Sequence, residues 1–402
     1  MQRAFIPSAS RLIGTCWLLA TSLPLAAWAA NTAPQTAKLA LISLSADARY
    51  QSKALELRHL GHPGGRLEQA AKLAIQDSAQ RLQRDGWSIH FLPVTLAQTE
   101  QLPQAMQQLR AQGVRYALLD LPRELVQRAV QASQGQVLLL NVSARDDSLR
   151  GRQCAANLFH TIPSHAMLAD ALAQYLAARN WRKALVLQGP LPADAALDAA
   201  WTRAAKRYGI KISAHKPFKP SGNPAERDLA NPRLLTNDRD HDVVAVWDSD
   251  GKFARSLPYA TQWPRPVVGS NGLVASAWHV QWLRNGGPQL SRRFKSLSGR
   301  DMVSQDWAAW LAVKTVAELL REVGTAPVAQ QAQHLRGEFF IAGYKGPSLS
   351  YRAWNGQLRQ PIVLAHADGV VGAAPVEGVL HARETMDTLG VDASENTCKL
   401  NP

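Results

Sequence analysis

The segment SLRGRQCAANLFHTIPSHAMLADALAQYL, residues 148–176, decides the fold. Before it, short apolar runs alternate with amphipathic stretches, and after it the same alternation starts again. Ser164 follows Pro163 at the position of a helix N-cap, because apolar residues recur behind it at helical spacing. The segment therefore predicts a connector between two similar α/β halves, and a chain of that design is suited to closing on a ligand.

The chain before the connector predicts parallel strands separated by helices. Near-continuous apolar runs such as YALLDL and QVLLLN are typical of strands buried on both faces of a sheet. The expected strands are residues 39–45, 88–94, 115–121 and 136–141, and the expected helices cover 67–82, 98–112 and 123–133. About 370 residues beyond the N-terminal segment exceed the usual size of one domain, so two lobes are expected.

The chain after the connector repeats this order and then changes character. Expected strands are residues 183–188, 210–218, 242–247 and 265–269, and expected helices are 164–176, 193–208, 226–236, 252–262 and 306–323. Pro264 and Pro266 predict that strand 265–269 is a sheet edge or a crossing. Short strands over 348–354, 360–365 and 369–376 follow, with Asn355-Gly356 as a hairpin turn.

Residues 1–30 have the pattern of a secretory signal peptide. Arg3 and Arg11 form a positive beginning, residues 12–28 are apolar, and Ala27 and Ala29 are small residues at the spacing of a cleavage site. The apolar stretch is short for a membrane anchor, and Cys16 lies inside it, which fits lipidation poorly. We therefore expect export to the periplasm.

Export leaves two cysteines, Cys154 and Cys398. In an oxidising compartment they predict one disulfide, and two unrelated buried thiols are the alternative. Loss of residues 1–30 also lowers the formal net charge from +14 to +12. The basic residues are dispersed, and no basic run with interleaved aromatics occurs, so the sequence does not predict a nucleic-acid partner.

Polar residues follow the predicted strands in both halves. In open α/β sheets ligands bind beyond the carboxyl ends of the strands, so these residues are candidate ligand contacts. They are Asp120, Asn141, Ser143, Gln188, Asp248 and Ser270. The loop after the first strand adds Arg58 and His59. Arg58 would bind an anion or a carbonyl group, Asp120 and Asp248 would accept hydrogen bonds, and the others would orient the ligand.

Several stretches of the chain resemble type I periplasmic substrate-binding proteins of branched-chain amino acid and amide ABC transporters. The likeness rests on FHTIPSHAMLADALAQYL, PRPVVGSNGL and DWAAWLAVKTVAELL. A narrower set, GRQCAANLFHTIPS, RPVVGSNGLV, WNGQLRQPIVLA and HARETMDTLGVDASENTCKL, is similar to a subfamily encoded beside pyrroloquinoline quinone-dependent alcohol dehydrogenase systems. The resemblance implies two lobes, each a parallel sheet flanked by helices, joined by three hinge crossings.

The resemblance also implies lobe boundaries and partners. Lobe one would comprise residues 38–155 and 270–335, lobe two 160–268 and 338–366, and the tail 367–402 would return to the hinge. The implied function is closure on a small polar ligand and its delivery to a permease by a monomeric protein. The expected partners are therefore that ligand and the ABC transporter, with no cofactor.

The residues also depart from that family. Amino-acid binders hold the ligand carboxylate with small hydroxyl residues and backbone amides after the third strand, where this chain has Asp120 and Pro122. Asp120 would repel a carboxylate and could instead pair with Arg58, or the two could bind opposite ends of a polar ligand. The family's amino-acid ligand is therefore not carried over.

No pattern in the chain argues for catalysis or for a resident metal. Gly269-Ser270-Asn271-Gly272 lacks the spacing of a nucleophile elbow, and Asp238, Asp240 and Asp242 lack the glycine and glutamate of a calcium loop. We therefore predict a non-enzymatic protein. The alternative to transport is a periplasmic accessory or sensor protein that binds a dehydrogenase or another protein on the same fold.

Overall fold

The computed structural model describes residues 34–51, 64–367 and 369–400. The predicted signal peptide, residues 1–30, and the two loop candidates Arg58 and His59 lie outside these ranges. Within them, no helix is both long and apolar enough to cross a membrane. The same ranges contain no group of His, Cys, Asp or Glu side chains suited to holding a metal ion.

The first half of the chain forms sheet A, five parallel strands in the order β2-β1-β3-β4-β5. Their bounds are β1 Gln35–Leu44, β2 Trp87–Leu96, β3 Tyr116–Asp120, β4 Leu138–Asn141 and β5 Leu158–His160. Side chains alternate between the two faces: Leu39 and Leu41 enter one apolar core, and Ala40 and Ile42 enter the other. Helices cover both faces, as the near-continuous apolar strands predicted.

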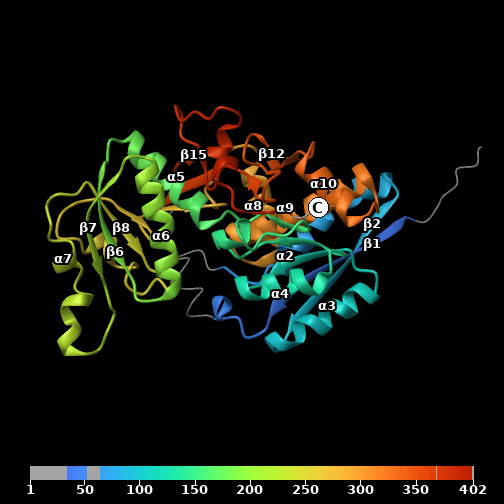
Figure 1. Ribbon diagram of the computed structural model, residues 1–402, viewed down its shortest axis with the longest axis horizontal. Coiled ribbons are helices and arrows are strands. Elements are labelled where there is room, and N and C mark those ends of the chain that lie inside the picture. The colour runs from blue at the N-terminus through green and yellow to red at the C-terminus, as the bar shows by residue number, and fades with distance from the viewer. Residues whose placement is uncertain (1–33, 52–63, 368, 401–402) are drawn as a thin grey trace, which may run out of the picture. The chain divides into compact units, whose positions relative to one another are not determined.

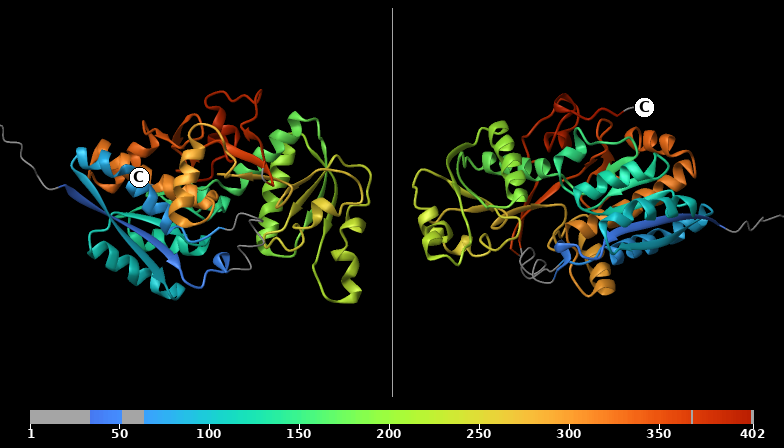
Figure 2. Two further views of the ribbon diagram at one scale, coloured as in Figure 1. Left: turned by 180° about the vertical axis from the view of Figure 1, so that it is seen from behind. Right: turned by 60° about the horizontal axis from the view of Figure 1, so that its bottom comes forward.

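Two helix layers enclose sheet A (Figures 1 and 2). One layer packs against the face that carries Leu39, and the other, α3 and α4, packs against the face that carries Ile42. The bounds are α2 Glu68–Arg84, α8 Gly287–Ser298, α9 Ser304–Val323 and α10 Val328–Arg336 in the first layer, and α3 Leu102–Ala111 and α4 Arg123–Ser133 in the second. Trp307 and Trp310 of α9 are buried in the first core, which confirms α9 as a packing helix.

The second half forms sheet B, with the order β15-β14-β10-β9-β8-β6-β7. The bounds are β6 Lys183–Gln188, β7 Lys211–Pro217, β8 Val243–Trp247, β9 Val267–Gly269, β10 Leu273–Ser276, β14 Ile362–His366 and β15 Gly369–Ala374. Strands β14 and β15 run antiparallel to their neighbours, and the other five run parallel to one another. Helices α5, His165–Ala178, and α6, Pro192–Arg207, pack on one face.

Two helices expected beside sheet B do not form, and one alternative for strand 265–269 is wrong. Strand β9 is an interior strand between β8 and β10, so it is not a sheet edge, and the crossing alternative stays a prediction; both prolines precede β9. The expected helix 226–236 is broken before Pro232 into a 3-10 helix, Pro224–Ala230, and a single turn, α7 Pro232–Leu235. The expected helix 252–262 is only a 3-10 turn, Leu257–Tyr259, because Pro258 lies in its middle and a proline there removes a helical hydrogen bond and clashes with the preceding turn.

The connector, residues 148–176, contains β5 and most of α5, with Ser164 as the helix cap. The Ser164 hydroxyl accepts a hydrogen bond from Met167 N at 3.3 Å, as predicted. The Asn355-Gly356 hairpin is also confirmed, since β12, Ser348–Tyr351, pairs antiparallel with β13, Leu358–Arg359. Strand β12 also pairs with β11, Ile341–Ala342. Cys154 and Cys398 form the predicted disulfide.

The lobe boundaries stay a prediction, and the sheet order favours one change to them. Strand β10, residues 273–276, pairs with β9 and β14 of sheet B, whereas the expected return to lobe one was at residue 270. Helix α8, which follows β10, packs with the core of sheet A. We propose that the second crossing follows Ser276, and that β14 stays in lobe two, where β15 of the tail pairs with it.

Candidate functional site

The carboxyl end of β3 carries a closed polar cluster, the Asp120 cluster, made of Asp47, Arg49, Tyr50 and Asp120. Asp120 is buried; Arg49 Nη2 donates to its Oδ1 at 3.1 Å, and the Tyr50 hydroxyl donates to its Oδ2 at 2.5 Å. The Asp47 carboxylate accepts from Arg49 Nε at 3.0 Å. Burial raises the pKa of Asp120, and Arg49 and Tyr50 oppose that rise. Side chains of the protein itself therefore bind the Asp120 carboxylate, which was predicted to contact a ligand.

Asn141 and Ser143 lie together after β4, but they hold a turn. Asn141 Oδ1 accepts from Ala144 N at 2.9 Å and from Ser143 N at 3.2 Å, while its Nδ2 donates to the Ala144 carbonyl at 2.7 Å. The Ser143 hydroxyl donates to the Leu121 carbonyl at 3.4 Å. Because both residues are buried and bonded within the loop, their visible role is to shape the end of sheet A.

Asp248 and Ser270 meet at the carboxyl ends of β8 and β9. The Ser270 hydroxyl accepts from Asp248 N at 2.8 Å, and the Asp248 carboxylate accepts from Phe253 N at 2.8 Å and Ala254 N at 2.7 Å. Burial raises the pKa of Asp248 to about 6, and the backbone donors oppose that rise. Gln188 ends β6 beside Trp247, in register with it, and is half-buried. Of the predicted residues that the structure describes, only Ser270 lines the cavity described next.

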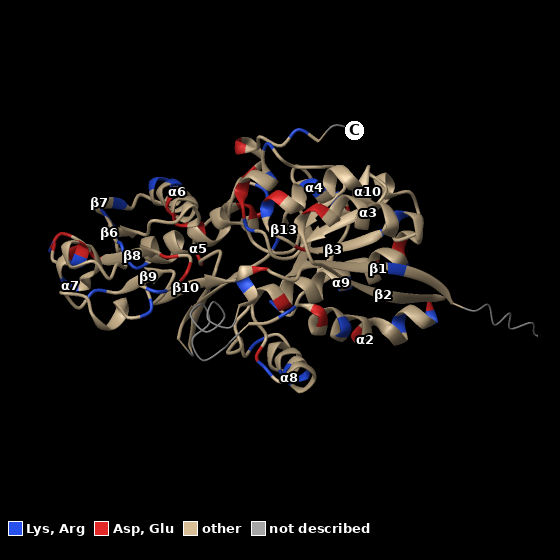
Figure 3. Ribbon diagram, turned by 90° about the horizontal axis from the view of Figure 1, so that it is seen from below, with Lys and Arg blue, Asp and Glu red and all other residues tan. Residues whose placement is uncertain are grey.

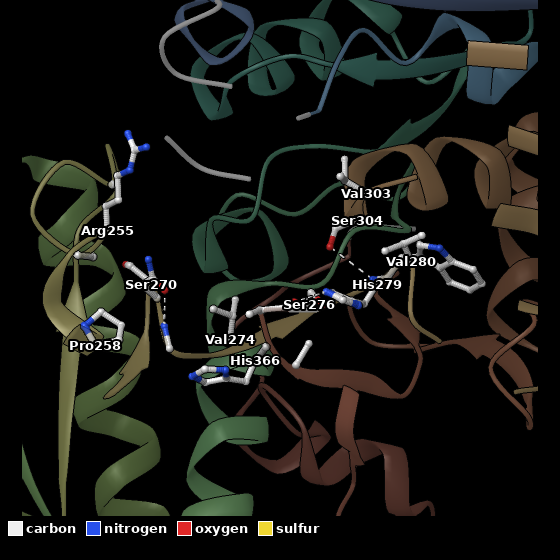
Figure 4. A pocket seen from close by; sticks show the side chains of 18 of the residues that line it. Arg255, Pro258, Ser270, Val274, Ser276, His279, Val280, Val303, Ser304 and His366 are labelled. Atoms are coloured by element: carbon white, nitrogen blue, oxygen red, sulfur yellow. Dashed lines mark hydrogen bonds between the residues drawn. The ribbon is translucent and has the colours of Figure 1, made fainter. Parts of the chain in front are cut away.

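A cavity of about 410 Å³ lies beside Ser270 (Figure 4). Sheet B supplies the loop after β8, the turn between β9 and β10, β10 itself and the end of β14. The other side comes from elements that pack with sheet A: the start of α9 and Arg145, which follows β4. Residues 278–280, on the way from β10 to α8, complete the wall. The cavity therefore has lining residues from both halves of the chain.

The arginine and histidine side chains of this lining give it a basic character. Arg145, Arg255, His279 and His366 line the cavity, and none of its described lining residues is Asp or Glu. In Figure 4, Arg255 and Ser270 stand on one side, and His279 and Ser304 on the other. His279 Nε2 lies 3.0 Å from the Ala367 carbonyl, which holds its ring at the wall. The lining thus favours a negatively charged guest.

Two buried hydrogen-bonding groups of the lining residues have no partner among the described residues. They are the indole Nε1 of Trp278 and the hydroxyl of Ser276, and both atoms are buried. Trp278 is only 2% exposed and stacks on Trp307 with ring centroids 6.3 Å apart. Ser304 fixes this wall, because its hydroxyl accepts from Ala277 N at 3.0 Å. A buried polar group without a partner is costly, so a bound molecule is a natural partner for each.

Sequence reasoning missed residues of both features. Arg49 and Tyr50 of the Asp120 cluster follow the first predicted strand but were not among the candidates, and Trp278 of the cavity lining lies in no predicted element. One signal was present: Ser276 and Trp278 come directly after an apolar run that follows Ser270-Asn271-Gly272. Had residues 273–276 been predicted as a strand, their polar end would have been a candidate by the strand-end rule.

The two sheets, their flanking helices and the crossings between them form the type I periplasmic binding protein fold. Residues 64–251 match the sequence family described as periplasmic binding protein. A search of the curated proteins finds no match.

Solved structures resemble the chain over most of its length. An amino-acid-binding protein from Brucella ovis, specific for leucine, isoleucine, valine, threonine and alanine, is 14% identical, with a TM-score of 0.70 over 91% of this chain and 99% of that one. A branched-chain amino acid ABC transporter ligand-binding protein from Burkholderia xenovorans is 12% identical, with a TM-score of 0.70 over 90% and 99%. A solute-binding protein from R. palustris in complex with benzoate is 14% identical, with a TM-score of 0.64 over 91% and 100%. At these identities the likeness establishes the fold.

Proposed function

We propose that the chain is an exported solute-binding protein that closes on a small ligand and delivers it to an ABC transporter. The cavity of about 410 Å³, lined by residues from both halves, carries the proposal. Its volume lies in the range of small-molecule sites. The matched family and the similar structures, which are described as binding proteins, support it. Residues 1–30 would direct export to the periplasm.

Closure follows from where the lining residues come from. Arg145 follows a strand of sheet A, and Arg255 follows a strand of sheet B. A ligand that touches both binds the closed arrangement better than the open one, so it shifts the population toward closure. The closed form would then be the state that the permease recognises.

A link to pyrroloquinoline quinone-dependent alcohol oxidation stays a prediction that rests on four resembling segments. Those segments include both cysteines of the disulfide and the turn at Ser270. The link predicts that the ligand is a substrate, a product or the quinone cofactor of such a system. Binding assays with these compounds test it directly.

One observation favours the second candidate, an accessory protein. The Asp120 cluster fills the end of β3 with the chain's own side chains. A protein that uses this fold to bind a dehydrogenase has no need to keep the end of β3 free for a small ligand. The test is co-elution with a purified pyrroloquinoline quinone-dependent dehydrogenase at physiological salt. If the two proteins co-elute and no small molecule binds, this candidate is favoured over transport. In the view of Figure 3, Lys and Arg residues occur together with Asp and Glu residues on α2 and α6.

A thermal-shift screen against alcohols, aldehydes, organic acids, quinone cofactor and metal ions tests the transport function. A ligand that binds the native state raises the melting temperature according to its affinity and concentration. Val280→Trp, which fills the cavity, should abolish the shift, and Val371→Trp on exposed β15 should preserve it. If every hit survives Val280→Trp, the cavity is not the binding site.

A further inference from the structure

We propose that the cavity binds an organic oxyanion, such as a carboxylate, that has an apolar body and carries no ammonium group. The inference rests on the proposed function and goes further, because it names the ligand class. Amino-acid binders such as the one from Brucella ovis take ligands with both charges. The described lining of this cavity offers partners for the negative charge but not for the positive charge.

The negative charge of the ligand has several complementary groups. Trp278 Nε1–H is a donor only, and the Ser276 hydroxyl can also donate; both are buried without a described partner. Arg145 and Arg255 add positive charge from opposite halves of the chain. A carboxylate oxygen would satisfy the buried donors through charge-assisted hydrogen bonds, which are the stronger kind. A neutral amide of the same shape would gain less.

A positive charge on the ligand has no complementary group in the described lining. None of the described residues that line the cavity is Asp or Glu, and the two predicted acceptors, Asp248 and Asp120, already accept hydrogen bonds from the chain. Asp248 lies behind Ser270 and uses its carboxylate for Phe253 N and Ala254 N. Asp120 accepts from Arg49 and Tyr50. An ammonium group would therefore lose its water beside arginines with no anion to replace it, which is unfavourable.

The rest of the lining suits an apolar body. Val274, Val280 and Met302 contribute aliphatic and thioether surface, and Trp278 contributes an aromatic ring that is held in place by Trp307. Aliphatic and aromatic side chains bind apolar groups by removing them from water. A carboxylate on a short aliphatic or aromatic body matches both parts of the wall.

Matched ligand pairs measured by titration calorimetry test this inference. The pairs are 4-methylpentanoate against leucine, 3-phenylpropanoate against phenylalanine, and benzoate against both benzamide and benzylamine. Within at least one pair the plain carboxylate should bind about tenfold tighter or more, as expected for hydrogen bonds to a charged group. If the zwitterion, amide or amine binds as tightly as its partner carboxylate, transport stands and the ligand class is wrong. If none of these compounds binds but the thermal-shift screen finds another ligand of the cavity, transport stands and the ligand class is wrong; if neither experiment finds a ligand, the proposed function fails together with the inference.

Variants then locate the binding. Trp278→Phe removes one N–H and keeps a ring, and its matched control is Trp354→Phe, because Trp354 Nε1 is also buried without a described partner but lies outside the cavity lining. Arg255→Gln is paired with Arg292→Gln on exposed α8. Each cavity variant should weaken carboxylate binding about fivefold or more, and each control should leave it unchanged. Arg255 is exposed, so its variant keeps the test valid even if the tryptophan variant does not fold. Unchanged affinity in both cavity variants overturns the inference.

Discussion

At the residue scale, the Asp120 cluster explains why the end of β3 differs from that of an amino-acid binder. Asp120 is 1% exposed, and its two oxygens are satisfied by Arg49 and Tyr50. A buried carboxylate that keeps an arginine partner is tolerated, whereas one that loses it leaves an uncompensated charge. The cluster is therefore coupled to folding, whatever the ligand is.

Replacing Arg49 by methionine tests this coupling. We expect Arg49→Met to lower the free energy of unfolding by about 2 kcal/mol or more, because Asp120 stays buried without its cation. Adding Asp120→Asn should recover part of the loss. Arg123→Met, which removes an exposed pair with Glu124, is the control and should cost less than about 1 kcal/mol. Urea denaturation measures all four proteins, and an Arg49→Met protein as stable as the native one would contradict the coupling.

A second residue-scale prediction concerns Asp170, which is fully buried. Burial raises its pKa to about 6, and Arg203 and Arg207 oppose that rise. Because the pKa lies above the ordinary value of 3.8, the native state binds the proton more tightly than the unfolded state. The resulting stabilisation is fully present below about pH 4 and is lost as the pH rises through about 6.

The measurement is the stability of native protein and Asp170→Asn at pH 7.5 and pH 5. Relative to the variant, the native protein should gain about 1 kcal/mol on going to pH 5. Subtracting the variant removes the titration of all other groups. Equal pH dependence in the two proteins would show that Asp170 does not titrate in this range.

At the element scale, the cap of α5 carries a local prediction. Ser164→Ala removes the acceptor for Met167 N and should lower the free energy of unfolding by about 1 kcal/mol. Ser45→Ala, at an exposed serine after β1, should change it by less than about 0.5 kcal/mol. Thermal unfolding followed by circular dichroism distinguishes the two, and equal melting temperatures would rule out the cap as a stabilising contact.

Elements were predictable where the sequence period and the local contacts agree. Strand β6 and helix α4 have the predicted bounds, Lys183–Gln188 and Arg123–Ser133, because each is a clean run between turn residues. Residues 252–262 were expected as a helix, but Pro258 interrupts it after the first turns. The Asp248 carboxylate, from outside the segment, instead binds Phe253 N and Ala254 N, and a tertiary contact of this kind leaves no periodic pattern in the sequence.

The same reason limits what the sequence could say of the site. The strand-end rule finds Ser270, which does line the cavity. It also selects Asp120 and Asn141, whose hydrogen bonds are made by Arg49, Tyr50 and Ala144. Trp278 reaches the cavity through a crossing segment, and no local pattern fixes the path of such a segment. A position at a strand end therefore predicts that a residue lies near the site. Whether its side chain can still bind a ligand depends on how the surrounding loops pack against it.

At the scale of the whole molecule, the C-terminal tail ties distant parts of the chain together. Cys398 is bonded to Cys154, which precedes β5 of sheet A. Gly390 N donates to Asp170 of α5 at 2.7 Å, and the Gly390 carbonyl accepts from Arg203 of α6 at 2.7 Å. Just before Gly390 in the tail, the Asp387 carboxylate accepts from Arg352 Nε at 2.8 Å. The tail thus contacts helices of sheet B while its end is fixed beside sheet A.

The disulfide closes a sequence separation of 244 residues, so its loss should be costly for the whole fold. In the chain-entropy model, closing so long a loop removes freedom from the unfolded chain and contributes about 4–5 kcal/mol. The double variant Cys154→Ser/Cys398→Ser should therefore unfold at a lower urea concentration than the oxidised native protein. The native protein under reducing conditions should behave like the variant, because both lack the cross-link. The variant itself should not respond to reductant, which controls for other effects of the reagent. If the oxidised native protein and the variant share one midpoint, the hydrogen bonds of Gly390 and Asp387 hold the tail without help from the disulfide.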